Sequence, residues 1–174
     1  MVTGGCVQMK MDINLISDLS TTGVYTLLLF LSKKVTMDIG RLGKQRFPMG
    51  YCSYTGSAFG KGSSNLKHRI ARHLRREKRK FWHIDYLLAN ENVSVEAVVA
   101  AKTNENIECN LNHYMKNIMG AEVPVRGFGA SDCRKNCASH LLYFPEIENV
   151  DWWVQKLVKH LQSSSGILSV FVVD

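Results

Sequence analysis

Three short stretches with the composition of β-strands occupy the first third of the chain. Residues 23–31, GVYTLLLFL, are apolar and rich in strand-forming residues, which predicts a buried strand. Residues 35–40 are polar enough for an edge strand, and residues 51–57, YCSYTGS, predict a third strand. The connection over residues 43–50 contains Pro and two Gly, so it is predicted to be a loop. Together these stretches predict an antiparallel meander.

The spacing of apolar residues then changes from that of strands to that of a helix. Leu66, Ile70 and Leu74 recur every four residues and predict the buried stripe of a helix over residues 65–80. Asn65, at the start of this pattern, is a suitable N-cap.

The same helix carries the net charge of the chain. Residues 67–80 hold eight Lys and Arg and one Glu, so they account for the whole net charge of +7. A concentrated basic surface is typical of a protein that faces a polyanion, above all nucleic acid, although a solvated basic face is the plain alternative. At about 100° per residue, Arg69 and His73 fall beside the apolar stripe, with Arg76 just outside them. The remaining arginines are expected to face water: Arg72, Arg75 and Arg79.

Helical and strand patterns alternate over the remainder of the chain. The strongest helical pattern spans residues 103–120, with Thr103 or Asn104 as N-cap and Gly120 as terminator. The other predicted elements are a short helix or turn over 81–91, strands over 93–101 and 139–144, a helix over 149–162 and an edge strand over 166–174.

This order of elements predicts an α/β fold of the α+β type, with a small central antiparallel sheet of three or more strands flanked by helices. A length of 174 residues suits one domain. We divide the chain into an N-terminal lead-in (1–20), a main domain (21–148) and a C-terminal helix and strand (149–174) packed on the same domain.

Composition narrows the class of protein further. An apolar content of 45% and a charged content of 21% are typical of a globular chain rather than a disordered one. No stretch reaches the length of about 20 apolar residues that spans a bilayer. The five cysteines are odd in number and unevenly spread, unlike a secreted disulfide framework. We therefore expect a cytoplasmic protein without a membrane partner.

An acidic residue interrupts the apolar face of the 103–120 helix. Glu108 lies on that face, where a buried carboxylate needs a partner, and a basic neighbour such as Arg69 could provide it. Cys109, one residue later, is expected to point the other way. The apolar residues of this face are Ile107, Leu111, Tyr114, Met115, Ile118 and Met119.

Three residues near the end of the main domain have the spacing of metal ligands. Cys133, Cys137 and His140 form a C-x₃-C-x₂-H pattern. A structural zinc ion needs four ligands, and the fourth is not evident, although Cys109 and Asp132 are candidates. We therefore expect a disulfide or free thiols here rather than structural zinc.

Several strings occur in the order found in a known nuclease superfamily. GVY at residues 23–25, YTG at residues 54–56, Arg69 and Glu108 resemble the motifs of the GIY-YIG nuclease superfamily. Longer strings, among them GYCSYTGSA, RIARHLR and WHIDYLL, are similar to those of its prokaryotic Uri-type endonuclease subgroup. The resemblance covers roughly residues 20–145, so the main domain is the expected nuclease domain.

The resemblance implies a DNA endonuclease that uses one divalent cation, Mg²⁺ or Mn²⁺. Tyr25 and Tyr54 would present their hydroxyls at the site, and Tyr54 would orient or deprotonate the attacking water. Arg69 would bind the scissile phosphate, and Glu108 would hold the metal. His73 would contact phosphate or relay a proton, unless it is an ordinary histidine at the edge of the core.

These residue types suit phosphodiester hydrolysis on chemical grounds as well. The reaction requires positioning and charge neutralisation more than covalent catalysis. One carboxylate can hold Mg²⁺ if phosphate oxygens and waters complete its octahedron, and the planar fork of arginine matches two phosphate oxygens. A tyrosine has a pKa of about 10, so it needs neighbouring positive charge to act as a base.

Further residues are candidates for contacts around the site. His83, Asp85, Ser131 and Asp132 are candidate lining residues, although Asp85 could simply cap a helix and His83 could be a structural hydrogen-bond partner. The basic residues expected to contact DNA are Lys67, Arg72, Arg75, Arg76 and Arg79.

Two other functions stay open on the sequence alone. The chain could be a nucleic-acid-binding module without catalysis, which would keep the basic helix. It could also recruit a protein partner or form a homodimer through the helix that contains Trp152 and Trp153.

Overall fold

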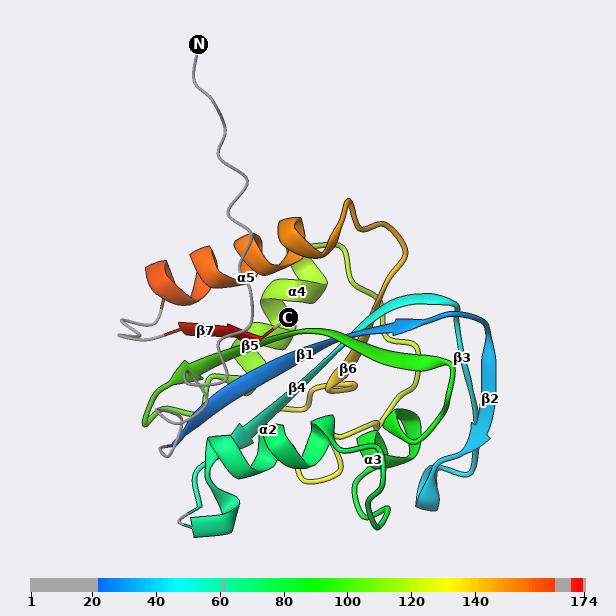
Figure 1. Ribbon diagram of the computed structural model, residues 1–174. Helices are drawn as coiled ribbons and strands as arrows, with labels where there is room; N and C mark the ends of the chain where they lie inside the picture. The colour runs from blue at the N-terminus through cyan, green and yellow to red at the C-terminus, as the bar shows by residue number, and fades with distance from the viewer. Residues whose placement is uncertain (1–21, 61, 165–169, 174) are drawn as a thin grey trace.

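The computed structural model describes residues 22–60, 62–164 and 170–173 (Figure 1). The strands of its central sheet are β1 (Gly23–Leu31), β4 (Gly50–Ala58), β5 (Val93–Lys102), β6 (Leu141–Phe144) and β7 (Val170–Val173). They pair antiparallel in the order β6-β4-β1-β5-β7. With helices on both faces of this sheet, the predicted α+β fold class is confirmed.

β1 lies at the centre of the sheet because its residues are apolar on both faces. It pairs along its whole length with β4 on one side and β5 on the other. Eight of its nine residues are buried, which is typical of a strand covered on both faces. Tyr25, Leu27 and Leu29 belong to one half of the core, whereas Val24 and Leu28 belong to the other.

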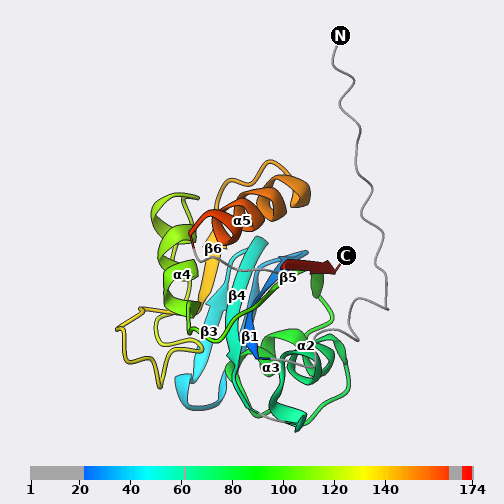
Figure 2. The same cartoon turned by 90° about the vertical axis from the view of Figure 1, so that its left-hand side faces the viewer.

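Helices cover the two faces of the sheet (Figures 1 and 2). On one face lie α2 (Leu66–Leu74) and α3 (His83–Leu88), and on the other lie α4 (Glu108–Asn117) and α5 (Val150–Ser164). The protein is therefore a three-layer arrangement in which a site at the edge of the sheet can take residues from both helical layers.

Most elements predicted after residue 80 are confirmed. The short helix predicted over 81–91 is α3, and the strands predicted over 93–101 and 139–144 are β5 and β6. α5 begins after Asn149, whose Oδ1 accepts a hydrogen bond from the backbone N–H of Trp152 at 2.8 Å. The final strand, β7, lies at the sheet edge as predicted.

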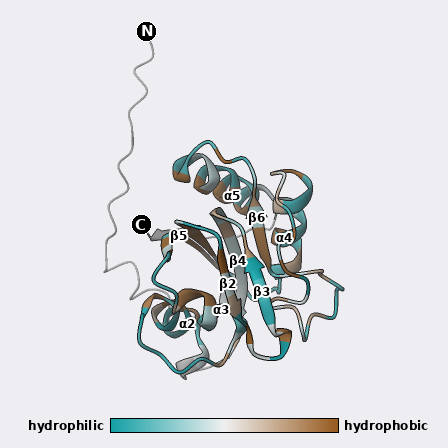
Figure 3. Cartoon of the chain, turned by 90° about the vertical axis from the view of Figure 1, so that its right-hand side faces the viewer, coloured by the Kyte–Doolittle hydropathy of each residue, from teal (hydrophilic) through white to brown (hydrophobic). Residues whose placement is uncertain are grey.

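The predicted three-stranded meander is wrong. β2 (Val35–Asp38) leaves the central sheet and pairs with β3 (Lys44–Phe47), which lies in the stretch predicted to be a loop. The long apolar β1 requires a partner of equal length, and β4 offers nine paired residues where β2 offers four. β3 is mostly hydrophilic (Figure 3), so this hairpin extends along the surface while β4 takes the central position.

The start of α2 follows the sequence pattern, and its last turn does not. Asn65 caps the helix as predicted, accepting a hydrogen bond at 3.0 Å from the backbone N–H three residues later. Leu66 and Ile70 are buried as predicted. Leu74, however, is 38% exposed, and His73 takes the buried position instead.

α2 ends at Leu74 rather than at residue 80 because a later side chain caps it. The backbone becomes extended at Arg75 and doubles back. Lys78 Nζ then donates hydrogen bonds to the carbonyls of Arg72 and His73, at 3.1 and 2.6 Å, which satisfies carbonyls at the helix end. The basic residues predicted on the last turns, Arg76 and Arg79, therefore lie on an exposed loop.

α4 begins at Glu108 and not near residue 103. Thr103 and Asn106, which precede the helix, form local turns instead of capping it. Thr103 Oγ1 accepts a hydrogen bond from Glu105 N at 3.0 Å, and Asn106 Oδ1 accepts one from Glu108 N at 3.1 Å. Such side-chain bonds compete with helical hydrogen bonds.

The buried face of α4 follows the predicted pattern with one clear exception. Ile107, Leu111, Met115 and Met119 are buried against the sheet. Ile118 is 71% exposed because the helix has already ended at the residue before it.

The predicted lead-in, residues 1–20, lies outside the described residues. Within the described part of the chain, no helix combines the length and the apolar character needed to cross a membrane. The division of the chain between residues 148 and 149 stays a prediction. In the structure, α5 packs on β5, and β7 pairs with β5.

Candidate functional site

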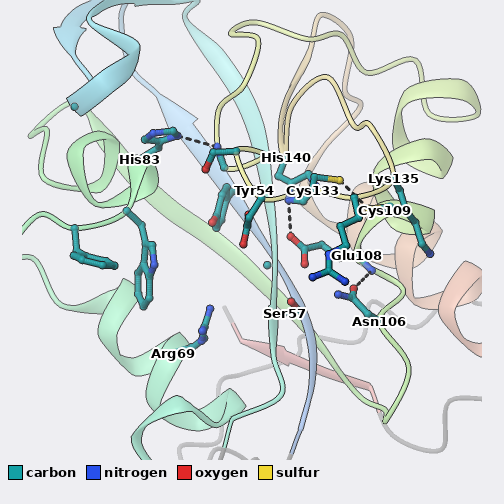
Figure 4. A pocket seen from close by; sticks show the side chains of 18 of the residues that line it. Tyr54, Ser57, Arg69, His83, Asn106, Glu108, Cys109, Cys133, Lys135 and His140 are labelled. Atoms are coloured by element: carbon teal, nitrogen blue, oxygen red, sulfur yellow. Dashed lines mark hydrogen bonds and ion pairs between the residues drawn. The ribbon is translucent and has the colours of Figure 1, made fainter.

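A cleft of about 1010 Å³ lies where the two helical layers meet at one end of the sheet (Figure 4). Tyr54 of β4, Arg69 of α2 and Glu108 of α4 all line it. Figure 4 shows Arg69 on one side of the cleft and Glu108 on the other. Folding therefore brings together three of the four residues that the nuclease motifs singled out.

Tyr25 and His73 lie behind the cleft and do not line it. Tyr25 is 1% exposed, and its hydroxyl lies 2.7 Å from His73 Nε2. Burial, together with the positive charges of Lys78, Arg72 and Arg69, lowers the pKa of His73 to about 3. The imidazole is therefore neutral at neutral pH and holds the buried tyrosine in place.

Two glycines make room for the tyrosine rings. A Cβ atom on Gly56, which pairs with Tyr25 across the sheet, would lie 2.5 Å from the Tyr25 hydroxyl. A Cβ atom on Gly129 would lie 2.8 Å from the Tyr54 ring. The glycine of the YTG string is thus required because the ring of Tyr25 crosses directly over it.

Tyr54 combines a buried ring with a position on the cleft wall. The ring packs edge-on against Phe128 at 6.3 Å, and the residue is 9% exposed. Burial raises the pKa of Tyr54 well above its usual value; Tyr25 and Glu108 raise it further, and Arg69 lowers it. The hydroxyl is therefore protonated at neutral pH in the absence of added positive charge.

Arg69 is held in the cleft by an aromatic ring. Its Cζ atom lies 5.0 Å from the centroid of Trp82, which also lines the cleft. Among the described residues, no carboxylate lies within ion-pair distance of this guanidinium. The charge of Arg69 is consequently available to an anion. Sequence reasoning did not assign a role to Trp82, although it belongs to the WHIDYLL string.

Arg72 faces inward, against the prediction that it faces water. It lies 2.6 Å from Asp85 Oδ2 in an ion pair whose carboxylate is fully buried. The same oxygen accepts hydrogen bonds from the backbone N–H groups of Phe81 and Trp82, at 3.0 and 2.9 Å. Asp85 therefore caps α3, the alternative role considered for it, and it does not line the cleft.

Glu108 finds its partner in a residue that the sequence did not pair with it. Its Oε1 lies 2.5 Å from Nδ1 of His140, and both side chains are largely buried. Burial by itself would lower the pKa of His140, but the Glu108 carboxylate raises it above the usual value. Arg69, the basic partner considered from the sequence, is not within ion-pair distance of Glu108.

Cys109 points into the cleft wall, contrary to the prediction that it points away. It is 7% exposed, and its sulfur lies 3.5 Å from that of Cys133. The prediction assumed that only the sheet-facing side of α4 is buried, but the loop before β6 covers a second side of that helix. Burial raises the pKa of Cys133, yet backbone hydrogen bonds at Cys137 and Lys135 lower it to about 6.

One family profile matches residues 24–163, a span that includes every cleft residue named above. Its description is "Domain of unknown function DUF123". The chain belongs to the DUF123 family. No curated protein and no solved structure matches the chain significantly. Because the family description assigns no activity, the function has to be inferred from the cleft.

Three further predicted residues line the cleft of the DUF123 chain. His83 Nδ1 accepts a hydrogen bond from the backbone N–H of Gly129 at 3.0 Å, so it also supports the loop above Tyr54. Ser131 and Asp132 line the cleft from that loop, and both are exposed.

Other basic residues of the DUF123 chain line the cleft without having been predicted. They are Arg41, which lies in the short helix η1 (Gly40–Leu42), and Arg134 and Lys135. All three lie outside the basic segment 67–80, so the clustering of charge in the sequence did not predict that they line the cleft. All five of the predicted DNA contacts lie outside the cleft lining: Lys67, Arg72, Arg75, Arg76 and Arg79.

The cleft of this DUF123 protein offers opposite charges on facing walls. The guanidinium of Arg69 can bind an anion, and the carboxylate of Glu108 can bind a cation. Tyr54, whose hydroxyl can form hydrogen bonds, lines the same cleft. A phosphate accompanied by a divalent cation matches this arrangement.

Proposed function

We propose that this DUF123 protein is a metal-dependent endonuclease that hydrolyses a phosphodiester bond in DNA. The observation that supports this function is the convergence of Tyr54, Arg69 and Glu108 in one cleft. They come from three elements that are far apart in the sequence, and their side chains have the chemistry that phosphoryl transfer requires.

Arg69 binds the scissile phosphate in this proposal. Trp82 packs beside its guanidinium, and no carboxylate among the described residues neutralises it. Its planar fork can donate two parallel hydrogen bonds to phosphate oxygens, which a lysine cannot do. The positive charge offsets the negative charge that builds up on those oxygens during hydrolysis.

Glu108 holds the divalent cation, Mg²⁺ or Mn²⁺. The residues present fit such a cation, because His140 occupies one carboxylate oxygen and leaves Oε2 for a metal. A single carboxylate suffices when phosphate oxygens and waters complete the coordination. When bound, the cation supplies charge neutralisation at the phosphate and the departing oxygen. His140 keeps the carboxylate oriented.

Tyr54 positions the attacking water. Because its pKa is raised, Tyr54 serves at neutral pH as a hydrogen-bond partner for the water. The positive charge of Arg69, together with that of a cation on Glu108, would favour its phenolate. The water oxygen forms a new bond to phosphorus as the P–O ester bond breaks, and the proton that the water loses is balanced by the proton taken up by the leaving oxygen. Tyr25 and His73 support the site from behind.

DNA approaches through its phosphates rather than its bases in this proposal. Arg41, Arg134 and Lys135 line the cleft, and further exposed basic residues lie on the loop before Phe81. Contacts of this kind position the backbone and carry little sequence information. We place the activity in the cytoplasm, because the five cysteines are odd in number and unevenly spread, unlike a secreted disulfide framework.

Cleavage of a panel of DNA structures tests the proposal. Duplex, single-stranded, flapped and branched DNA are incubated with the wild-type protein and Mg²⁺ or Mn²⁺. We expect cleavage of at least one of these structures, and a loss of about 10²–10³-fold in kcat/KM in Arg69→Ala. Lys159→Ala is the matched control, because Lys159 is exposed on α5, on the opposite face of the sheet.

The panel also separates the alternative functions. Equal cleavage by the wild type and Arg69→Ala would indicate a contaminating nuclease and would contradict the proposal that this chain is an endonuclease. Salt-sensitive binding without cleavage under any cation would instead support a nucleic-acid-binding module.

A further inference from the structure

Folding adds a fourth ligand to the C-x₃-C-x₂-H pattern. Cys109, the second residue of α4, meets Cys133, Cys137 and His140 of the loop before β6. Three sulfur atoms and one ring nitrogen all lie within 4.8 Å of one another. The sequence left Cys109 and Asp132 as alternatives for the missing ligand, and the structure brings Cys109 into this cluster.

We propose that these four residues bind a structural zinc ion. Three thiolates and an imidazole form a donor set that suits Zn²⁺, and four protein ligands leave no coordination position for water or substrate. The sulfur atoms of Cys109 and Cys133 lie 3.5 Å apart. In a tetrahedral site with Zn–S bonds of about 2.3 Å, two thiolates lie about 3.8 Å apart. The cluster therefore has nearly the dimensions of a zinc site.

The loop that carries three of the ligands has few other contacts to hold it. Residues 129–138 contain no buried side chain. A backbone hydrogen bond from Gly127 N to the carbonyl of Ala138, at 2.7 Å, closes the base of the loop but not its tip. A metal that joins Cys133 and Cys137 to α4 would hold the tip where a hydrophobic core does not reach.

The histidine of the cluster is already oriented for metal binding. Nδ1 of His140 lies 2.5 Å from Glu108. The other ring nitrogen, Nε2, is buried, and the imidazole interacts with the thiol of Cys133, another member of the cluster. Metal-binding histidines commonly donate their second N–H to a carboxylate. Zinc on Nε2 would therefore fix the ring and, through it, the carboxylate of Glu108.

The zinc site goes beyond the proposed nuclease and does not depend on it. The four ligands are different residues from Tyr54, Arg69 and Glu108, and metal content can be measured without DNA. A chelator would remove both the zinc and the cation needed for cleavage, so loss of activity in a chelator cannot distinguish the two sites. The test therefore measures zinc itself.

Metal analysis of the purified full-length chain is the first test. We expect about one zinc per chain in the wild type after gel filtration, because the site is a closed four-ligand site. Cys133→Ser and Cys137→Ser should each lower the zinc content at least about tenfold. Cys52→Ala is the control, since Cys52 is buried in β4 and belongs to no ligand cluster in the described chain; it should keep the zinc.

Two measurements on the wild type remain decisive if the serine variants do not fold. Cobalt substituted for zinc should show the absorption of a tetrahedral cobalt–thiolate centre. In alkylation followed by mass spectrometry, Cys133 and Cys137 should react only after zinc has been removed. Glu108→Gln, measured by competition with a chelator, should weaken zinc binding by about tenfold.

Three results would overturn the proposal. They are a wild-type chain with neither zinc nor a cobalt–thiolate band, a pair of cysteines joined as a disulfide after purification in reducing buffer, and an equal loss of zinc in Cys52→Ala and Cys133→Ser. Absence of nuclease activity would leave the zinc measurement unaffected.

Discussion

The two walls of the cleft are built by different means. The α2 wall, formed by Arg69, Trp82 and His83, rests on a hydrophobic core and on the buried ion pair of Arg72 and Asp85. The loop wall is formed by Glu108 and by residues 129–140, and its outer part contains no buried side chain.

Packing of buried side chains therefore explains how the α2 wall is held in position, but it does not explain how the loop wall is held. The α2 wall places the guanidinium of Arg69 through aromatic contact with Trp82, beside the ion pair of Arg72 and Asp85. The loop wall places the carboxylate of Glu108 through His140, a residue of the cysteine cluster. We therefore expect the α2 wall to respond to changes in packing and charge, and the loop wall to respond to metal.

Loss of Asp85 should give the largest change in stability. Asp85→Ala removes the carboxylate that pairs with Arg72 and accepts from two backbone N–H groups, and we expect a loss of about 3 kcal/mol in the free energy of unfolding. Asp85→Asn keeps an acceptor for both N–H groups and should lose less. Urea denaturation measures both variants, and a loss below about 1 kcal/mol in Asp85→Ala would show that this ion pair does not hold the α2 wall.

Protonation of His73 should weaken the same wall in acid. Its pKa is lowered to about 3 in the folded chain from 6.5, so the unfolded chain binds the proton more strongly. Its contribution is complete above pH 6.5 and is lost progressively as the pH falls from 6.5 towards 3. The cost is about 2 kcal/mol at pH 5.

A comparison with His73→Gln isolates this effect from the carboxylates that also titrate in acid. Glutamine keeps a polar group near the Tyr25 hydroxyl but does not titrate. The stability difference between the two proteins should therefore shrink as the pH falls from 7 to 5. A difference that stays constant over this range would contradict the assigned pKa.

The N-cap of α2 should make the smallest contribution. Asn65→Ala removes the acceptor for the N–H of His68 and should cost about 1 kcal/mol in unfolding free energy. Asn65→Asp keeps the acceptor and should restore most of that stability. Thermal unfolding compares the three proteins, and equal melting temperatures for Asn65→Ala and the wild type would argue against the cap.

The sequence predicted most of the elements because their apolar patterns are local. β1, β5 and α5 each follow from composition and spacing within a single stretch. The pairing of β2 with β3 did not follow, since pairing depends on the length and polarity of partners elsewhere in the chain.

Helix ends were harder to predict than helix positions. α2 stops early because Lys78 returns to bond its terminal carbonyls, and α4 starts late because Asn106 and Thr103 form local turns. These competing side-chain bonds are invisible to periodicity.

The candidate site was predictable only where motifs marked it. Tyr54, Arg69 and Glu108 were singled out by the family resemblance, and the structure places all three in the cleft. His140 as the partner of Glu108, and Cys109 as a member of the cysteine cluster, depend on how the loop folds over α4. No pattern within one stretch encodes that contact.

The central claim is that Glu108 and Arg69 act on one phosphate from opposite walls. The most direct measurement compares cleavage and binding of the preferred DNA by the wild type, Glu108→Gln and the control Glu105→Gln, with zinc content measured in each. Glu105 is exposed, lies outside the cleft and carries the same charge. We expect Glu108→Gln to lose at least about 100-fold in cleavage while it still binds DNA, and Glu105→Gln to cleave normally. Normal cleavage by a zinc-containing Glu108→Gln protein would contradict the assignment.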